Sequence, residues 1–385
     1  MKKLALFSLL AAVATLAALG VVMLASTSYY SDEAGGESYR ALRQQGIWLG
    51  VALVFCSAAA MIDFNVWHRC RWWLYGIALA GLLFCFVPGI GELVNGARRW
   101  VSLRSFGLNM IHFQPSEFAK LACAVVLAGW FTRNEPHTEE FVGGFLMPGL
   151  LLVSLVVIIA AEVDLGSASL VALLGGAMMF VAGVRLRFLV PIVVCGAGSL
   201  ALAVKLIPNR VTRILAFLNL EKYKDSFGLQ QWRAMLSFGS GGPQGLGLGN
   251  GRQKMLFLPE AHTDFIFPMI GEELGLAGSA FVVAMFLLLT GGGMWIAAHA
   301  PNRFGKLLAF GITLMLAMEA LLNMGVTTAL LPNKGLPLPF VSYGGSSLLS
   351  AMIGVGILIN IHRQSVYARN PDLLPVRRRR MQSVA

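Results

Sequence analysis

Charged residues are scarce in this sequence, and their scarcity excludes a water-soluble protein. Only 13% of its 385 residues are charged and 57% are apolar, whereas soluble domains average about 25% charged and 45–50% apolar. Mean hydropathy is +0.71. So few charges could not cover a soluble surface, and we expect an integral membrane protein. Continuous apolar runs of about 20 residues, rather than alternating segments of about ten, exclude a transmembrane β-barrel.

The sequence also lacks paired cysteines. No C-x-x-C motif occurs, and this absence argues against a zinc site or a disulfide framework. Four of the five cysteines fall within apolar runs, so we expect them to act as small apolar side chains. The five are Cys56, Cys70, Cys85, Cys123 and Cys195.

Ten apolar runs are long enough to cross a bilayer as helices, which predicts an all-α polytopic membrane protein with a large extracytoplasmic loop after the seventh span. The first run is too long for a signal-peptide core, and no A-x-A site closes it, so we expect it to be retained. Several runs begin or end at Pro or Gly, which interrupt helices. The runs are 4–25, 46–62, 72–88, 116–132, 145–162, 168–184, 188–207, 270–297, 307–331 and 346–362.

Ten spans place both termini on one side of the membrane, and the basic residues indicate the cytoplasm. With that orientation 15 Lys and Arg lie inside and 13 outside, and the outside count falls to 6 when the long loop 208–262 is set aside. Cytoplasmic loops are enriched in such residues, and the run Arg377–Arg380 suits anionic headgroups at the inner leaflet. Membrane topology therefore explains the net charge of +11 without nucleic acid.

Seven of the outside cations lie in the loop 208–262, on the face where positive charge is usually avoided. An anionic ligand at the outer leaflet, such as a pyrophosphate headgroup, would explain them, although long loops also tolerate charge. Apolar residues recur at helical spacing in 211–218 and 229–236, as in short helices that lie in the membrane interface. Two surface helices packed on the bundle fit the same pattern.

Glycine supplies seven of the thirteen residues in 239–251. The tract is not a dinucleotide-binding fingerprint, because no strand precedes it and no βαβ unit surrounds it. Glycine permits positive φ angles and a close approach of the backbone to another group. A flexible loop is the alternative interpretation. The tract leads directly to Arg252 and Lys254.

Asp264 lies where this polar loop becomes an apolar helix, immediately before Phe265-Ile-Phe267. Burial at the edge of hydrocarbon would raise its pKa toward a value suited to a general base, although nearby cations would oppose that shift. The alternative is a structural role, in which Thr263 or Asp264 caps the first free N–H groups of the helix.

Other ionisable residues fall at membrane depth, where an acid costs about 2.5–3.5 kcal/mol on insertion scales. Glu117 and Lys120 share a helix face at i, i+3 and should pair. Glu162 and Asp164 close the fifth run, and Glu319 lies near the middle of the ninth. Structural pairing explains each one separately. Together they indicate a polar cavity that opens outward.

The connection between the ninth and tenth runs, Leu331–Ser347, contains three prolines, which stiffen an extended loop. Lys334 is its only charged residue and is suited to meet an anion.

These stretches closely resemble the SEDS family (shape, elongation, division and sporulation), and the Asn-Lys-Gly and Gly-Asn-Gly-Arg-Gln-Lys stretches favour its division branch over its elongation branch. The resemblance covers residues 10 to 362. Three positions depart from the family pattern, namely Val163, Pro268 and Glu319, and none of them changes Asp264. The matching stretches are Asn95–Trp100, Gln114–Lys120, Asp164–Gly166, Gly245–Gly251, Leu258–Gly275, Lys334–Pro339 and Ser342–Ser347.

The resemblance implies a transmembrane domain over 1–362 with an extracytoplasmic loop 208–269, followed by a basic cytoplasmic tail, 363–385. It implies a peptidoglycan glycosyltransferase that polymerises lipid II at the outer face of the bacterial cytoplasmic membrane during septal synthesis, together with a class B penicillin-binding transpeptidase and other division proteins. Asp264 matches the essential loop aspartate of the family. The residues expected to contact substrate are Arg99, Trp100, Glu117, Lys120, Gln231, Arg252, Lys254, Lys334 and Ser342.

In the expected reaction, Asp264 removes the proton of the acceptor hydroxyl, while Arg252, Lys254 and Lys334 meet the pyrophosphate of the donor. A divalent cation, Mg²⁺ or Mn²⁺, would suit a carboxylate and a pyrophosphate together. A lipid II transporter that performs no bond chemistry is the alternative, because membrane-depth acids suit that class as well. An elongation-type polymerase and a scaffold for division proteins are further alternatives.

Overall fold

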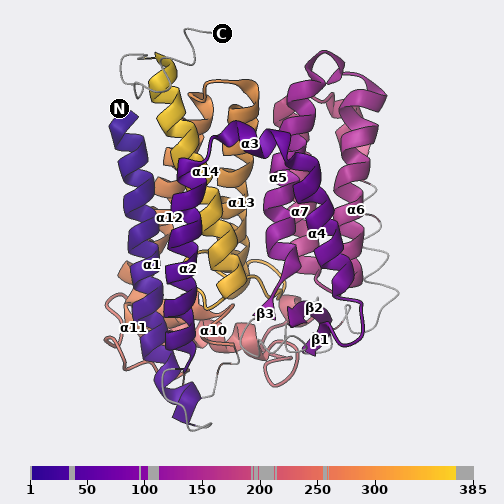
Figure 1. The fold of residues 1–385 in the computed structure, drawn as a ribbon. Helices are drawn as coiled ribbons and strands as arrows, with labels where there is room; N and C mark the ends of the chain where they lie inside the picture. The colour runs from indigo at the N-terminus through magenta and orange to yellow at the C-terminus, as the bar shows by residue number, and fades with distance from the viewer. Residues whose placement is uncertain are drawn as a thin grey trace.

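The chain forms a bundle of long helices with a small sheet and several shorter helices at one end (Figure 1). The structure is a computed structural model, and it describes residues 2–33, 40–94, 97–102, 112–191, 194, 198, 212, 215–254, 258 and 260–369.

The helices account for most of the described chain and are named in chain order. In the first half they are α1 (Lys2–Glu33), α2 (Arg40–Met61), α3 (Phe64–Arg69), α4 (Arg71–Phe84), α5 (Pro115–Arg133), a 3₁₀ turn (Glu135–His137), a π-helical turn (Phe141–Leu146), α6 (Met147–Ala161) and α7 (Leu165–Ala182). In the second half they are α10 (Leu229–Gly241), α11 (Ile266–Glu273), α12 (Gly275–Ala298), α13 (Arg303–Thr327) and α14 (Gly345–Arg369).

Seven helices of the described chain are long and apolar enough to cross a membrane, which supports a polytopic membrane protein. They are α1, α2, α6 with the π-helical turn before it, α7, α12, α13 and α14. The shorter α4 and the charge-bearing α5 coincide with two more of the predicted runs. The run 188–207 lies largely outside the described residues, so the count of ten spans stays a prediction.

Local signals in the sequence set several helix ends. Asp164 caps α7 by accepting a hydrogen bond from Ser167 N (3.1 Å), and Gly183 ends that helix at φ +102°, an angle that glycine adopts without steric cost. Asn302 caps α13 through Gly305 N (2.8 Å). Pro115 opens α5 in the first turn, where its missing N–H removes no helical bond.

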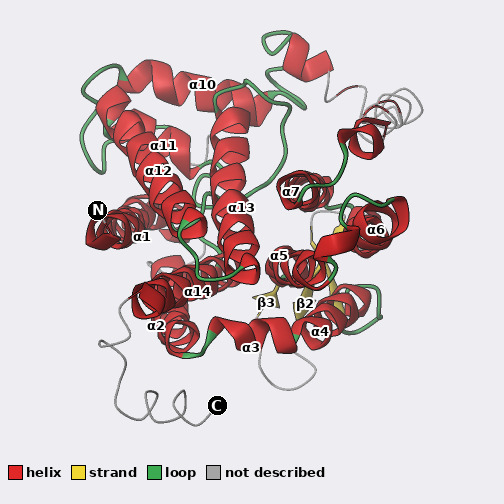
Figure 2. Ribbon diagram, turned by 90° about the horizontal axis from the view of Figure 1, so that it is seen from above, coloured by secondary structure: helices red, strands yellow, loops and turns green. Residues whose placement is uncertain are grey.

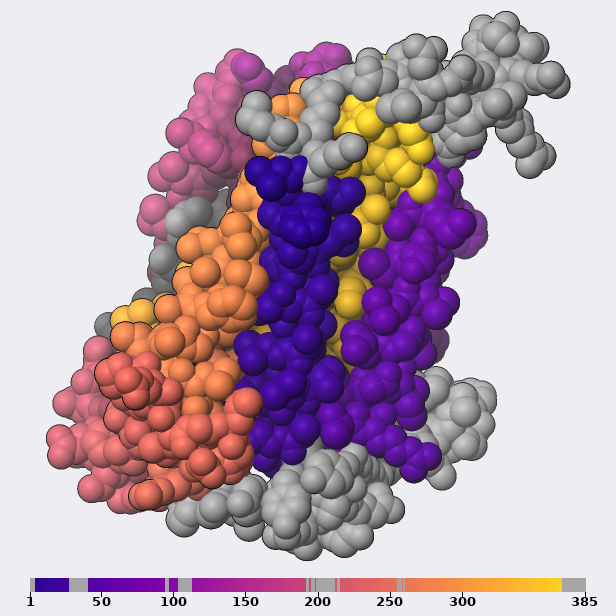
Figure 3. Space-filling view, turned by 90° about the vertical axis from the view of Figure 1, so that its left-hand side faces the viewer, coloured from indigo at the N-terminus to yellow at the C-terminus, as the bar shows by residue number. Residues whose placement is uncertain are grey.

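The helices form two groups that meet at α5 and α13, as the view along the bundle shows (Figure 2). Helices α4 to α7 make one group, while α1, α2 and α12 to α14 make the other. Figure 3 shows α1 between α12 on one side and α2 and α14 on the other. Helix α1 begins and α14 ends at the same end of the bundle, whereas α10, α11 and the sheet lie at the opposite end (Figure 1).

Exposed and buried residues are distributed as expected for a helix bundle surrounded by lipid. Helices α2 and α6 expose large apolar side chains such as Phe55 and Val157, because the hydrocarbon of lipid is as apolar as they are. Helix α5 is interior and rich in alanine, and Ala124 lies close to Gly311 of α13. Small residues let helix backbones approach each other and gain dispersion contacts.

The expectation of an all-α fold is incomplete, because three antiparallel strands follow α4. They are β1 (Gly91–Val94), β2 (Ala97–Ser102) and β3 (His112–Phe113), in the order β1-β2-β3, with Trp100 opposite Glu92 and a bulge after Glu92. Strands of two to six residues are too short to give the alternating pattern that identifies a strand in sequence.

The predicted run 270–297 is also divided differently. Helix α11 is a separate helix whose eight residues are all buried, and α12 begins afterwards at Gly275, where φ is +68°. A methyl group placed on Gly275 would lie 2.4 Å from the backbone nitrogen of Gly245, and Gly245 itself has φ +79°. The two glycines therefore permit a backbone contact between the glycine-rich tract and the start of α12.

This contact predicts that Gly275→Ala destabilises the protein by about 1–3 kcal/mol, since alanine meets both an unfavourable φ and a clash. Thermal unfolding of the purified protein in detergent measures the loss. Gly291→Ala is the matched control, because Gly291 lies within α12 with open space around it, and alanine there should leave stability unchanged or raise it. Equal melting temperatures for the two variants would contradict the prediction.

Candidate functional site

Three successive carbonyl groups hold the segment that carries Asp264. His262 O accepts from Tyr343 N (3.0 Å), and Thr263 O accepts from the Ser342 hydroxyl (2.6 Å). Asp264 O accepts from Asn323 Nδ2 (2.8 Å), and that amide also donates to Leu336 O (2.6 Å). Because α13 and the loop before α14 both bind this segment, its backbone is fixed from two directions.

The carboxyl group of Asp264 is half-buried and lies against Gly335. A methyl group on Gly335 would come within 2.5 Å of Asp264 Oδ2, so the backbone of the loop passes directly beside the carboxylate. Among the described residues, no side chain or backbone group donates a hydrogen bond to the Asp264 carboxylate. The helix-cap interpretation is wrong, because the cap residue of α11 is Phe265 and no side chain caps this helix.

Burial and the neighbouring charges set the proton affinity of Asp264. Burial first, and then the negative charge of Glu260, raise the pKa of Asp264 to about 7, while Arg99 acts in the opposite direction. A carboxyl group with a pKa near neutral pH is suited to accept a proton and release it again. Nearby cations were expected to lower the pKa of Asp264, but burial raises it by more than Arg99 lowers it.

Lys334 extends from the residue next to Gly335 toward α7. Its ammonium lies 3.4 Å from the hydroxyl of Ser169 and forms no ion pair among the described residues. Burial lowers the pKa of Lys334, and the negative charge of Asp164 partly opposes this. Leu336, two residues on, packs against Gly166 at the start of α7. The loop thus brings a half-buried cation to the same end of the bundle as Asp264.

Arg99 and Trp100 come from β2, in the sheet that the sequence did not predict. Both side chains are half-buried. The positive charge of Arg99 acts on both Asp264 and Glu162, which places it in the same electrostatic environment as the two acids. Arg98, its neighbour on the strand, is exposed instead. Arg99 is the extra residue of the bulge, because Glu92 pairs with Trp100 and Leu93 with Arg98.

The predicted pair of Glu117 and Lys120 is confirmed, and it has a third member. Lys120 Nζ lies 2.8 Å from Glu117 Oε1 and 2.6 Å from Glu319 Oε1, and all three side chains are buried. The position of Glu319 toward the bundle interior is therefore confirmed as well. One ammonium serves two carboxylates, so the cluster joins α5 to α13 by charge-assisted bonds in a medium of low dielectric constant.

Gln231 and Ser342 are engaged with the backbone rather than directed at a ligand. The amide nitrogen of buried Gln231 donates to Val326 O (2.8 Å) and Leu331 O (2.7 Å), and so connects α10 to the end of α13. The Ser342 hydroxyl, besides donating to Thr263, accepts from Leu338 N (2.8 Å). Both residues hold the loops around Asp264 in place.

Lys254 and Arg252 differ in environment although they are two residues apart. Lys254 is buried, with its ammonium 2.7 Å from Glu273 Oε1, whereas the Arg252 side chain is exposed. The tract before them is pinned, since Gly249 N donates to Glu273 Oε2 (3.0 Å). This agrees with close backbone approach, rather than flexibility, as the reason for its glycines.

Helix α10 packs through small and polar residues and presents apolar ones outward. Gln231, Ala234 and Ser237 are buried, whereas Met235 and Leu236 are exposed. Packing on the bundle is thus confirmed for this helix, and its exposed apolar side chains suit the hydrocarbon edge of an interface. The predicted helix over 211–218 lies largely outside the described residues.

Sequence reasoning did not identify two features of this region. Asn323 holds Asp264 in place through its backbone carbonyl. A polar residue at membrane depth in the run 307–331 could have indicated this role. Glu162, which the sequence did place at membrane depth, is buried beside the Cys85 thiol. Glu272 and Glu273 bind the glycine-rich tract. In the sequence, these two glutamates were distinguished only by lying in Leu258–Gly275, a stretch that resembles the SEDS family.

The described residues do not form a metal site. No group of three or more His, Cys, Asp or Glu side chains comes together in the parts of the chain that the structure describes, whereas Mg²⁺ prefers six oxygen ligands. The donor set around Asp264 therefore does not fit a metal held by protein alone.

Known proteins match this chain along most of its length. A family profile described as cell cycle protein, with FtsW, RodA and SpoVE in its name, matches residues 7–367. A probable peptidoglycan glycosyltransferase FtsW from Geobacter metallireducens is 42% identical over 357 residues, which cover 92% of this chain and 93% of that protein. Its counterpart from Coxiella burnetii is 37% identical over 351 residues, with 90% and 93% covered.

Two solved structures share the fold. A chain from a peptidoglycan synthase complex superposes with a TM-score of 0.75 at 28% identity and covers 93% of this chain and 98% of its own length. The rod shape determining protein RodA of Thermus thermophilus superposes with a TM-score of 0.68 at 28% identity, with 93% and 97% covered.

The buried charge cluster generates a stability prediction. Lys120→Met should destabilise the protein by about 3–5 kcal/mol, because it leaves two buried carboxylates without their cation. Adding Glu319→Gln should recover part of the loss, since one of those charges disappears. Lys306→Met, at an exposed lysine of α13, is the control and should change stability by less than about 0.5 kcal/mol. Thermal unfolding in detergent measures all four proteins, and a Lys120→Met variant as stable as the control would refute the assignment.

Proposed function

This chain belongs to the family of cell cycle proteins named for FtsW, RodA and SpoVE, and we propose that it is a peptidoglycan glycosyltransferase that polymerises lipid II into glycan strands. Relatives named FtsW that are 36–42% identical to it include those from Geobacter species, and a chain of a peptidoglycan synthase complex shares its fold. The protein is a multi-pass protein of the bacterial inner membrane.

The topology that supports this function has ten membrane-spanning helices with both termini in the cytoplasm. Helix α1 begins and α14 ends at one end of the bundle (Figure 1), as an even number of spans requires. Asp264 precedes α11, at the opposite end, and therefore faces the outer leaflet where lipid II is polymerised. The loop 208–269 forms part of that face, and the basic tail 363–385 remains in the cytoplasm.

Asp264 acts as the general base. Its carboxylate takes the proton from the 4-hydroxyl of the acceptor GlcNAc, and the oxygen attacks C1 of the donor MurNAc. The bond between C1 and the diphosphate oxygen breaks, and its electron pair leaves with undecaprenyl diphosphate. The observation that carries this assignment is a half-buried carboxyl group with a pKa of about 7, without a hydrogen-bond donor among the described residues and held by three backbone bonds.

Cations around Asp264 stabilise the negative charge that develops on the leaving diphosphate. The candidates are Lys334, half-buried and without an ion pair among the described residues, and Arg99, whose charge acts on Asp264. Arg252 is exposed on the same face. Charge-assisted hydrogen bonds from fixed cations are worth more in a site of low dielectric constant than in water. Lys254, by contrast, serves this site through the loop that it anchors.

The enzyme works during septal synthesis together with a class B penicillin-binding transpeptidase. The similarity to FtsW proteins supports the septal role, since the FtsW protein of Geobacter metallireducens is 42% identical to this chain and the RodA of Thermus thermophilus 28%. The likeness to a chain from a peptidoglycan synthase complex supports a transpeptidase partner, which would cross-link the strands that this enzyme makes.

Asp264→Asn should reduce polymerisation of lipid II at least about 100-fold, because the amide cannot accept the hydroxyl proton. Purified protein is incubated with lipid II, and glycan strands are resolved on a gel. Asp225→Asn, which removes an exposed acid of the same loop, is the control and should retain activity. Normal strand synthesis by a correctly folded Asp264→Asn variant would remove the base assignment.

The rate should depend on pH through the ionised fraction of Asp264. With a pKa of about 7, activity should level off above that pH and fall about tenfold per pH unit below it. Glu260→Gln removes a negative charge that raises this pKa, so it should move the acidic limb to lower pH. Rate profiles of kcat/KM against pH test this. If Glu260→Gln does not shift the acidic limb of the profile, the group that titrates is not Asp264.

Gly335→Ala should displace the Asp264 carboxylate, since the new methyl group would lie 2.5 Å from Oδ2. We expect polymerisation to fall about 10- to 100-fold with an unchanged fold, because general-base catalysis depends on geometry within about 1 Å. Gly344→Ala is the matched control in the same loop, where the closest atom to a new methyl group is 3.8 Å away. Equal activity of the two variants would contradict the contact.

A further inference from the structure

Two adjacent glutamates at the end of α11 hold the loop that carries Arg252. Both Glu272 and Glu273 are buried. Glu272 Oε1 accepts from Arg252 N (2.8 Å) and Gln253 N (3.3 Å), and its Oε2 also lies 3.3 Å from Gln253 N. A carboxylate that accepts backbone N–H groups forms charge-assisted bonds. The backbone at Arg252 is therefore fixed to α11.

The neighbouring Glu273 fixes the other side of the same loop. Its carboxylate accepts from Lys254 Nζ (2.7 Å) and from the hydroxyl of Ser26 in α1 (2.7 and 2.9 Å). Lys254 Nζ further contacts Ser26 Oγ (2.7 Å) and donates to Gly249 O (2.8 Å). An ammonium has three donors, and three acceptors already surround this one. Lys254 therefore anchors the loop and has no donor left for an anion.

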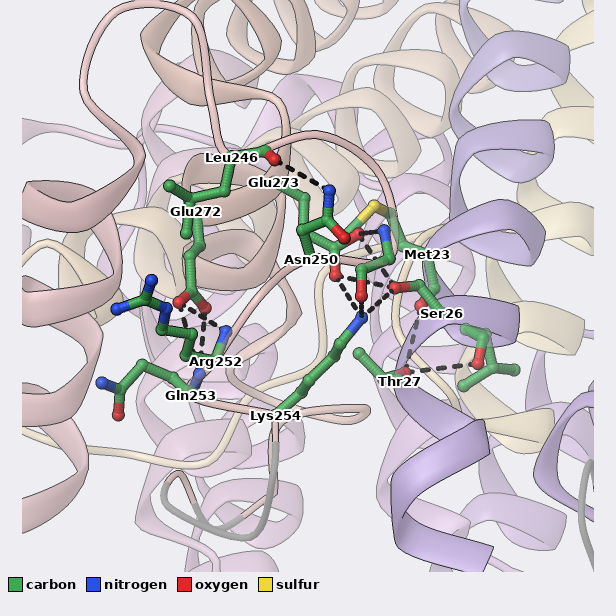
Figure 4. Close-up of polar contacts among 12 residues, drawn as sticks. Met23, Ser26, Thr27, Leu246, Asn250, Arg252, Gln253, Lys254, Glu272 and Glu273 are labelled. Carbon is green, nitrogen blue, oxygen red and sulfur yellow. Dashed lines mark hydrogen bonds and ion pairs between the residues drawn. The ribbon is translucent and has the colours of Figure 1, made fainter.

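Arg252 is oriented differently from Lys254. Figure 4 shows the Lys254 ammonium directed toward Ser26, while the Arg252 guanidinium lies on the other side of the loop and points away from it. The Arg252 side chain is exposed, although its backbone nitrogen is held by buried Glu272. This combination presents a cation to an outside ligand from a fixed backbone.

Helix α11 connects this cation to the base. Asp264 stands two residues before the first residue of α11, and Glu272 is the last residue but one. Eight helical residues at 1.5 Å each make a spacer roughly 12 Å long. All eight are buried, so the spacer cannot tilt without disturbing the core.

We propose that Glu272 is a positioning residue, which fixes the backbone of Arg252 relative to α11 so that the exposed guanidinium meets the diphosphate of the lipid-linked donor. The proposal rests on the proposed function, because it assigns the anion that Arg252 binds. The partners of buried Glu272 are the backbone N–H groups of Arg252 and Gln253 and the hydroxyl of Ser240. Glu272 acts through the backbone of Arg252.

A double-mutant cycle tests this dependence. Arg252→Ala should lower kcat/KM for lipid II about 10- to 100-fold, as expected for the loss of a charge-assisted contact. Glu272→Gln keeps an oxygen that accepts the two backbone N–H groups but loses its charge, so we expect a loss of about tenfold. If Glu272 acts through Arg252, adding Glu272→Gln to Arg252→Ala should cost less than about twofold more.

Gly335→Ala supplies the matched control. It displaces the Asp264 carboxylate and changes neither Glu272 nor the loop that carries Arg252. Its effect should multiply with that of Arg252→Ala. Melting temperatures of all variants separate a change of position from a loss of fold. Should Glu272→Gln not yield monodisperse protein, Glu272→Asp, which keeps the charge and retracts it by one methylene group, takes its place in the cycle.

If the double variant loses kcat/KM by the product of the two single losses, the proposal is overturned, since Glu272 would then act independently of the guanidinium. An active Arg252→Ala variant would overturn it as well. Failure of the proposed function gives a different result, in which the unaltered protein makes no glycan strands or Asp264→Asn remains active. The two outcomes are read from the same gel and are therefore distinguishable.

Discussion

The attachment of three consecutive carbonyls to α13 and to the loop before α14 is the constraint on which the site depends. Asn323 and Ser342 bind the segment 262–264 from two elements, and the loop backbone at Gly335 lies against the Asp264 carboxylate. A carboxyl group without a hydrogen-bond donor among the described residues would otherwise move toward solvent. Held in place and half-buried, it keeps a raised pKa, and thus the ability to exchange a proton at neutral pH.

Buried charge connects the parts of the bundle that the site requires. Lys120 joins α5 to α13 through two carboxylates, and Lys254 joins the glycine-rich tract to α1 and α11. Such pairs contribute little net stability compared with apolar packing, but breaking one leaves an uncompensated charge. The arrangement therefore favours one relative position of these helices over others, and this position brings Asp264, Lys334 and the sheet to the same end.

Particular residues show how far prediction from the sequence could go. The pair of Glu117 and Lys120 followed from spacing on one helix, and the inward position of Glu319 followed from the cost of a charge in lipid. Arg252 and Lys254 looked alike as cations after a glycine tract, yet one is exposed and the other is enclosed by Glu273 and Ser26. Ser26 is more than two hundred residues away in the chain, so no local pattern could reveal that contact.

The sequence by itself determined the membrane environment, the long helices and the identity of the acid at the hydrocarbon edge. These properties depend on hydropathy and on local spacing, which a chain carries wherever it folds. Tertiary structure alone decided that Asp264 is not a helix cap, that a short sheet carries Arg99, and that Glu272 holds the backbone of Arg252. The position of Asp264 and the bond from Glu272 to Arg252 depend on contacts between separate segments, whose energies exist only once the bundle has brought the segments together. The strands are too short for a pattern in the sequence to reveal them.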